Sequence, residues 1–108
     1  MDKTIYVQKP SFDYIRDGTK KYEIRQHRGF FLNCNEGENL TIKPHRNSDE
    51  AIIKKIFKIL VYRNLQDLFT DLEFTQCIPN SNSLEECVNH MSKYYSKTNC
   101  HYVAIQLS

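Results

Sequence analysis

A twelve-residue stretch in the middle of the chain, AIIKKIFKILVY (51–62), limits the fold more than any other. Its apolar positions fit the periods of both a helix and a strand, but the β-branched isoleucines favour a strand. Alternation along that strand predicts an inward face made of Ile53, Phe57, Ile59 and Val61. The stretch is much shorter than the roughly 20 apolar residues that a membrane-spanning helix needs.

Helix and strand signals on either side of this stretch give a mixed α+β pattern. Three strands are predicted before it, over residues 4–8, 21–26 and 39–43, with a short helix over 10–18. Two helices follow it, and their capping residues are Asn64 and Ser83, each with an acidic residue three positions later. An alternating strand over 101–107 ends the chain, and we expect it to pair with the first strand.

The two later helices each carry an apolar stripe that predicts a buried face. The stripe of the first is Leu65, Leu68, Phe69 and Leu72. The stripe of the second is Leu84, Cys87, Val88, Met91 and Tyr95. The two helices therefore pack on the sheet and contribute to one core.

Composition places this pattern in a single intracellular domain. A chain of 108 residues can build one core but is too short for two, so the domain spans 1–108. The apolar fraction of 40% and the charged fraction of 26% are typical of a globular protein. The start, MDKTIYVQKP, has neither the apolar segment nor the cleavage site of a secretory signal. We therefore expect a cytoplasmic or nuclear protein that is not secreted and not bound to a membrane.

The cysteines are not spaced like metal ligands. Cys34, Cys77, Cys87 and Cys100 form no C-x-x-C pair, and the four histidines do not bracket them at zinc-finger spacing. We therefore expect free thiols, no metal and no cofactor.

The formal net charge of +2 is unevenly distributed, because the front half of the chain is basic and the back half is acidic. This asymmetry favours an anionic partner on one face, although chance explains it equally well. Lys, Asn and Ile are frequent, which is typical of an AT-rich genome, and a viral origin is one option.

Opposed charges crowd beside one turn in the segment GTKKYEIR (18–25). Gly18 is suited to end the preceding helix with a left-handed cap. Alternation gives the next strand a charged face of Lys21, Glu23 and Arg25, and an apolar face of Tyr22 and Ile24. The apolar face is expected to meet the core.

Four of these residues fill the pattern G-x-K-x-x-E-x-R, which resembles the signature of the ASCH domain family: Gly18, Lys20, Glu23 and Arg25. The proline-led helix before the turn, the tyrosine-led helix from Tyr62, the S-x-E-E start at Ser83 and the last strand resemble the same family in the same order. The likeness spans nearly the whole chain. It implies a PUA-like fold, a small β-barrel of about five to six strands with short flanking helices.

The chain departs from the family pattern at two places, and the second departure bears on activity. Asn80 stands where many relatives have glycine, and asparagine tolerates the left-handed backbone of such a turn. One branch of the family, the 4-acetylcytidine amidohydrolases, uses a lysine and a threonine of this turn and a later glutamate. Lys20 matches the lysine, but Glu23 replaces the threonine, and residues 79–82 contain no glutamate.

The resemblance and the charges together favour binding of RNA, a nucleotide or a modified nucleoside in a cleft around the motif. Arginine and lysine suit phosphate and carbonyl oxygens, and aromatic side chains such as Phe30, Phe31 and Tyr94 suit stacking with bases. The candidate binding residues are Gly18, Lys20, Lys21, Glu23, Arg25, Arg28 and Tyr95.

Three alternatives stay open from the sequence. The first, which the resemblance keeps open, is a small hydrolase of the ASCH family, a ribonuclease or an amidohydrolase, in which Lys20 and Glu23 would be catalytic and Arg25 would stabilise negative charge. In the second, the charged strand is only a solvated sheet edge that discourages aggregation. The third is a protein-interaction adaptor, for which only the acidic back half argues.

Overall fold

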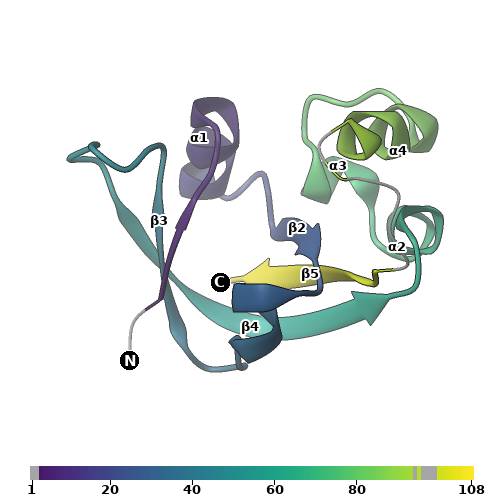
Figure 1. Cartoon of the computed structure of the whole chain (residues 1–108). Coiled ribbons are helices and arrows are strands. Elements are labelled where there is room, and N and C mark those ends of the chain that lie inside the picture. Colours follow the sequence, from purple (N-terminus) through teal and green to yellow (C-terminus); the bar gives the residue numbers. More distant parts are fainter. Residues whose placement is uncertain (1–2, 94, 96–99) are drawn as a thin grey trace.

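The computed structural model describes residues 3–93, 95 and 100–108, and its main feature is a curled sheet of five strands (Figure 1). The strands lie in the order β1-β3-β4-β5-β2. Their bounds are Lys3–Tyr6 (β1), Tyr22–Gln26 (β2), Asn39–Lys43 (β3), Ile52–Tyr62 (β4) and Tyr102–Leu107 (β5). The helices are Lys9–Asp17 (α1), Leu65–Asp71 (α2), Phe74–Cys77 (α3) and Leu84–Ser92 (α4), with a 3-10 turn at Gly29–Asn33 (η1). The predicted α+β class is thus confirmed, with five strands in one sheet.

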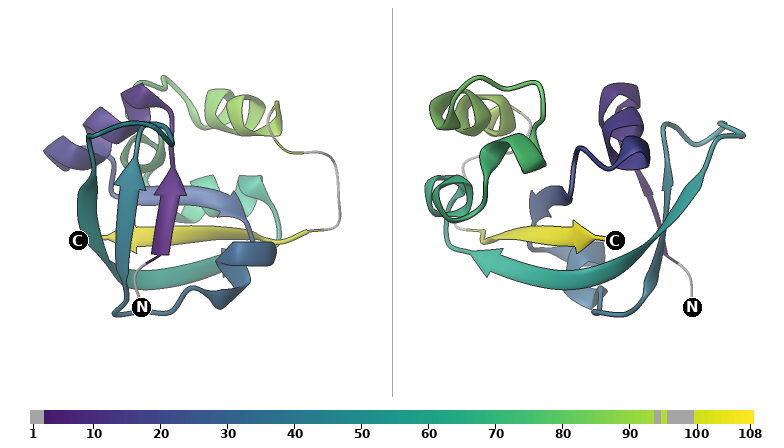
Figure 2. Two further views of the ribbon diagram at one scale, coloured as in Figure 1. Left: turned by 60° about the vertical axis from the view of Figure 1, so that its left-hand side comes forward. Right: turned by 180° about the vertical axis from the view of Figure 1, so that it is seen from behind.

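The long strand β4 makes the curl, because its two ends pair with different neighbours. Its first part pairs with β3 and its second part with β5, both antiparallel. A register shift lies between Ile56 and Lys58. In Figure 2, β1 and β3 consequently cross β5 and β2 at a steep angle.

The predicted inward face of β4 is wrong for three of its four residues. Ile53, Phe57 and Val61 are 65%, 59% and 46% exposed, whereas Ile56 is fully buried. The register shift explains this for the first part of the strand, because an irregularity changes which positions face the core. Ile59, beyond the shift, packs against the buried residues as predicted.

Two apolar clusters stabilise the sheet, one toward α1 and one toward α2, α3 and α4. Strand β5 separates them: Val103 and Ile105 belong to the first cluster, and Ala104 between them belongs to the second. The predicted stripes of the two later helices lie in the second cluster. Both predicted N-caps form, since Asn64 Oδ1 accepts from the Asp67 N–H at 2.8 Å and Ser83 Oγ from the Glu86 N–H at 3.1 Å.

The first and last strands do not pair, contrary to expectation. Strand β1 pairs in parallel with β3, and β5 has β4 on one side and β2 on the other. Both edges of β5 are therefore occupied, which leaves β1 only the free edge of β3. Helix α3 was not predicted. Within the described ranges, no helix combines the length and apolar character that crossing a membrane requires.

Candidate functional site

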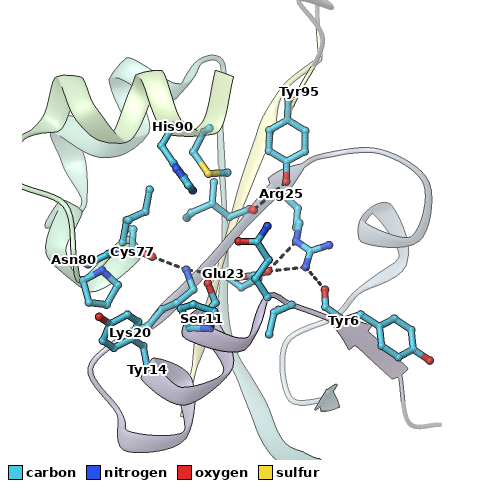
Figure 3. A pocket seen from close by; sticks show the side chains of 17 residues that line it. Tyr6, Ser11, Tyr14, Lys20, Glu23, Arg25, Cys77, Asn80, His90 and Tyr95 are labelled. Atoms are coloured by element: carbon cyan, nitrogen blue, oxygen red, sulfur yellow. Dashed lines mark hydrogen bonds and ion pairs between the residues drawn. The ribbon is translucent and has the colours of Figure 1, made fainter. Parts of the chain in front are cut away.

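A pocket of about 310 Å³ lies between α1 on one side and α3 and α4 on the other, with β2 at its base (Figure 3). Helix α1 contributes Ser11 and Tyr14, and α4 contributes His90 and Met91. The chain after α3 adds residues 78–80. Four of the residues predicted for the site line it: Lys20, Glu23, Arg25 and Tyr95.

The turn after α1 directs Lys20 into this pocket. Gly18 adopts a left-handed conformation, with φ of 88°, and its N–H donates to the Ile15 carbonyl at 3.2 Å, as the predicted cap requires. Two residues later, the Lys20 N–H donates to the Tyr14 carbonyl at 3.0 Å. The chain therefore reverses at Gly18 and enters β2 with Lys20 held against the end of α1.

Gly18→Ala is expected to lower the free energy of unfolding by about 1 kcal/mol, because an alanine is strained in the left-handed region. A Cβ at this position would meet no atom within 4 Å, so the loss would come from the backbone alone. Urea unfolding measures it. Gly18→Asn is the control, since asparagine tolerates this conformation and should cost less. Equal losses in both variants would contradict this account of the turn.

Three charged side chains form a chain of contacts at the base of the pocket. Lys20 Nζ lies 3.4 Å from Glu23 Oε1 and donates to the Cys77 carbonyl at 2.5 Å. The other carboxylate oxygen, Glu23 Oε2, accepts from Arg25 Nε at 2.8 Å. The Glu23 carboxylate thus contacts two cations, Lys20 before it and Arg25 after it in the motif.

These charges are buried, so the solvated-edge alternative is wrong for the two residues at the centre. Lys20 and Glu23 are each 6% exposed, although β2 is an edge strand of the sheet. The predicted sorting of β2 is confirmed, since Ile24 packs in the second cluster while Glu23 pairs across from Ile105 of the first. A buried ion pair is a weak source of stability, because desolvation offsets its Coulomb energy. Stability alone therefore gives little reason for this arrangement.

Arg25 extends the contacts from the base of the pocket toward its opening. One of its terminal nitrogens donates to the Tyr6 carbonyl at 2.8 Å, and its guanidinium lies 5.2 Å from the centre of the Phe31 ring. Its side chain is 24% exposed. Arg25 can therefore meet a ligand and solvent while Glu23 fixes its orientation.

Tyr95 gives the pocket an aromatic wall. Its hydroxyl donates to the Ile24 carbonyl at 3.3 Å, and its ring contacts Tyr102 edge to face. Burial is the main cause that raises the pKa of Tyr95 above the ordinary value, so the hydroxyl stays a hydrogen-bond donor at neutral pH. Tyr94, which the sequence also suggested for stacking, lies outside the described residues.

Three of the predicted binding residues do not line the pocket. Lys21 is exposed, and its backbone joins β2 to Gln76 and Leu107. Arg28 is exposed and precedes η1. Gly18 shapes the turn without lining the cavity.

The sequence analysis missed the lining residues from helices α1 and α4 and from the loop after α3. Ser11 and Tyr14 could have been found, because they lie beside the buried positions Phe12 and Ile15 on the predicted helix. Asn80 and His90 carried no such signal, since only the packing of α4 brings them to the site.

The thiols near the pocket are poor nucleophiles. Cys77 is fully buried, and burial raises the pKa of its thiol to about 12, so it stays protonated at neutral pH. Burial also raises the pKa of Cys87. In the part of the chain that the structure describes, no three His, Cys, Asp or Glu side chains are grouped as metal ligands.

Solved structures with the same fold support the comparison made from the motif. No family model and no curated relative matches the sequence. Hypothetical protein PH0355 is similar over 100% of this chain and 98% of its own, with a TM-score of 0.89 and 20% identity. Protein PF0455 from Pyrococcus furiosus matches 100% of this chain and 96% of its own, with a TM-score of 0.81 and 17% identity.

The ASCH protein from Zymomonas mobilis gives the link to the family suggested by the sequence. It matches 99% of this chain and 65% of its own length, with a TM-score of 0.65 and 16% identity. A mutant of that protein superposes with a TM-score of 0.74 at 14% identity. At identities this low, the superpositions establish the shared fold alone. The chain thus has the PUA-like fold of the ASCH domain proteins.

Proposed function

We propose that this chain binds a base of RNA, or a modified nucleoside, in the pocket between α1 and α4. The observation that carries the proposal is the set of Lys20, Glu23 and Arg25 at the base of that pocket, of which the first two are buried. Two cations and a carboxylate in one apolar-walled cavity offer donors and an acceptor side by side. A ligand that displays both a carbonyl oxygen and an N–H group complements such a set.

The dimensions of the pocket suit a ligand of this kind. Small-molecule sites generally occupy about 300–1,000 Å³, and this pocket is at the lower end of that range at about 310 Å³. The size therefore favours a single nucleoside over a larger ligand. Tyr14 and Tyr95 supply aromatic surface along its walls.

The charges predict a preference among bases. Glutamate accepts hydrogen bonds from an amino or ring N–H of a base, and lysine donates to a carbonyl. Guanine, cytosine and uracil each display both groups on one edge, whereas adenine has no carbonyl. Adenosine is consequently expected to bind more weakly than guanosine, cytidine or uridine, because its acceptor beside the amino group is a ring nitrogen in place of a carbonyl oxygen.

The contacts of Lys20 favour binding over catalysis. Its Nζ lies within contact distance of both the Cys77 carbonyl and the Glu23 carboxylate, so its hydrogens point at acceptors. That arrangement suits a cation that holds a ligand better than a free amine that attacks one. A hydrolase remains the alternative, and product formation would reveal it.

The test is calorimetric titration with the four nucleosides, a panel of modified cytidines and a short single-stranded RNA, with mass spectrometry of each mixture. Lys20→Met is expected to weaken binding about 10- to 100-fold, the loss of a hydrogen bond from a charged group. Lys21→Met is the matched control, because the neighbouring lysine is exposed and does not line the pocket. Equal affinities of the two variants would reject the site, and a new product would make the protein an enzyme.

A further inference from the structure

We propose that the pocket takes its base from a single-stranded nucleic acid, and that neighbouring nucleotides lie on a strip of arginine and aromatic side chains that begins at the pocket lining and continues outside it. The strip consists of Arg25, Phe31, Phe30, Tyr6 and Arg46. The inference rests on the proposed function and specifies its ligand as a polymer. We call these five residues the Arg–aromatic strip.

Arg25 connects the strip to the pocket. It lines the cavity together with Tyr6, and it donates to the Tyr6 carbonyl at 2.8 Å. On another side, its guanidinium lies 5.2 Å from the centre of the Phe31 ring. Figure 3 shows the Tyr6 ring directed away from Lys20 while Arg25 lies between the two residues. A chain leaving the pocket past Arg25 would therefore meet the strip.

The strip continues in both directions from Arg25. The rings of Phe31 and Phe30 pack edge to face with centroids 5.0 Å apart. At the other end, the Arg46 guanidinium lies 5.6 Å from the centre of the Tyr6 ring. Tyr6 and Phe30 are 42% and 39% exposed, so part of each ring is open to solvent.

Salt bridges hold the loop that carries Arg46 against α1. Glu50, at the end of that loop, accepts from Lys9 Nζ at 3.1 Å and from an Arg16 nitrogen at 3.2 Å. The backbone before the loop is fixed too, because the Val7 N–H donates to the Lys43 carbonyl at 3.0 Å. Arg46 and Tyr6 are therefore carried by two segments joined at their base.

The chemistry of the strip identifies the occupant. Arginine binds phosphate oxygens with paired donors, and exposed aromatic rings stack on bases, so a single strand satisfies both kinds of group. A free nucleoside filling a pocket of about 310 Å³ would leave Phe30 and Arg46 without contact. Exposed Phe57 on β4 also has lysines beside it in sequence, but it does not line the pocket. The Arg–aromatic strip is the exposed aromatic surface that continues from the cavity.

The experiment compares a nucleoside with single strands of RNA and DNA of eight nucleotides, by titration at several salt concentrations. The strands are expected to bind at least about 10-fold more tightly than the nucleoside, since each stacked base adds a contact of that order. The double variant Phe30→Leu, Arg46→Gln, in which neither side chain lines the pocket, is expected to lose about that factor for the strand and to keep its affinity for the nucleoside. Its salt dependence should fall by about 0.7 in log–log slope, the value of one lost phosphate contact.

The matched control is Phe57→Leu with Arg63→Gln, which removes an exposed aromatic ring and an exposed arginine elsewhere. Equal affinity for the nucleoside and both strands would overturn the inference, as would equal losses in the two double variants. A strip that docks a protein instead would give the same negative result. Strand binding that depends on Phe30 and Arg46 but not on Lys20 would keep the strip and reject the proposed pocket. Preference between the RNA and DNA strands then identifies the polymer.

Discussion

Glu23→Gln is expected to lower the free energy of unfolding by about 3–5 kcal/mol, the usual cost of removing one partner from a buried ion pair. The substitution keeps the shape of the side chain but removes the charge that compensates Lys20. Lys20 is 6% exposed, so water replaces little of what the carboxylate provides. The loss should therefore exceed that of an ordinary surface substitution several-fold.

Urea unfolding at neutral pH measures this effect, and Glu50→Gln provides the comparison. Glu50 also contacts two cations, Lys9 and Arg16, but its side chain is 48% exposed. Exposed pairs contribute at most about 1 kcal/mol, so this variant is expected to stay near the wild type. A small loss at Glu23, similar to that at Glu50, would show that the charges of the pocket are hydrated.

The double variant Lys20→Met, Glu23→Gln is expected to recover most of that stability and to lose about 100-fold in affinity for the ligand. Removing both charges leaves no unpaired buried ion, and such replacements are often neutral or stabilising. A glutamine oxygen at the second position can still accept from Arg25. The ligand, however, loses a charged donor and a charged acceptor, which together contribute about 3 kcal/mol at the low end, or about 100-fold in affinity.

A double variant that keeps its stability but loses its affinity distinguishes a binding site from a structural ion pair. If the buried charges served the fold alone, the double variant would be less stable and would bind as the wild type does. The single and double variants also form a thermodynamic cycle, which isolates the Lys20–Glu23 interaction from the effects of each residue by itself.

Much of the local structure followed from short-range signals in the sequence. Gly18 ended α1 as predicted because a left-handed cap depends on the residue itself and its immediate neighbours. The caps at Asn64 and Ser83 formed for the same reason. The sorting of Glu23 and Ile24 to opposite faces of β2 followed from alternation alone.

Features set by long-range packing were not accessible in this way. The outward position of Ile53 and Phe57 depends on a register shift between β4 and β5, and no residue near the shift predicts it from the sequence. The pairing of β1 with β3 depends on which strand edges remain free once the sheet has assembled. Alternation also left open whether the charged face of β2 is exposed to solvent, because the positions of α1 and α3 determine its burial.

The residues of the candidate site also fall into two groups, those that the sequence predicts and those that only the structure identifies. Lys20, Glu23 and Arg25 lie within six positions of one another, so the motif alone predicted that they belong to one site. Tyr6 and Arg46 belong to two other segments of the chain, and nothing in their local sequence connects them to the motif. Spatial neighbours of this kind require the structure.

The most direct test of the central claim is the affinity of the folded double variant Lys20→Met, Glu23→Gln for a single-stranded RNA of eight nucleotides containing all four bases. Circular dichroism and urea unfolding first establish that the variant is folded. The account predicts that the wild type binds this RNA and that the folded variant binds it about 100-fold more weakly. Wild-type affinity in the folded variant would contradict it, because the buried charges would then play no part in holding a ligand.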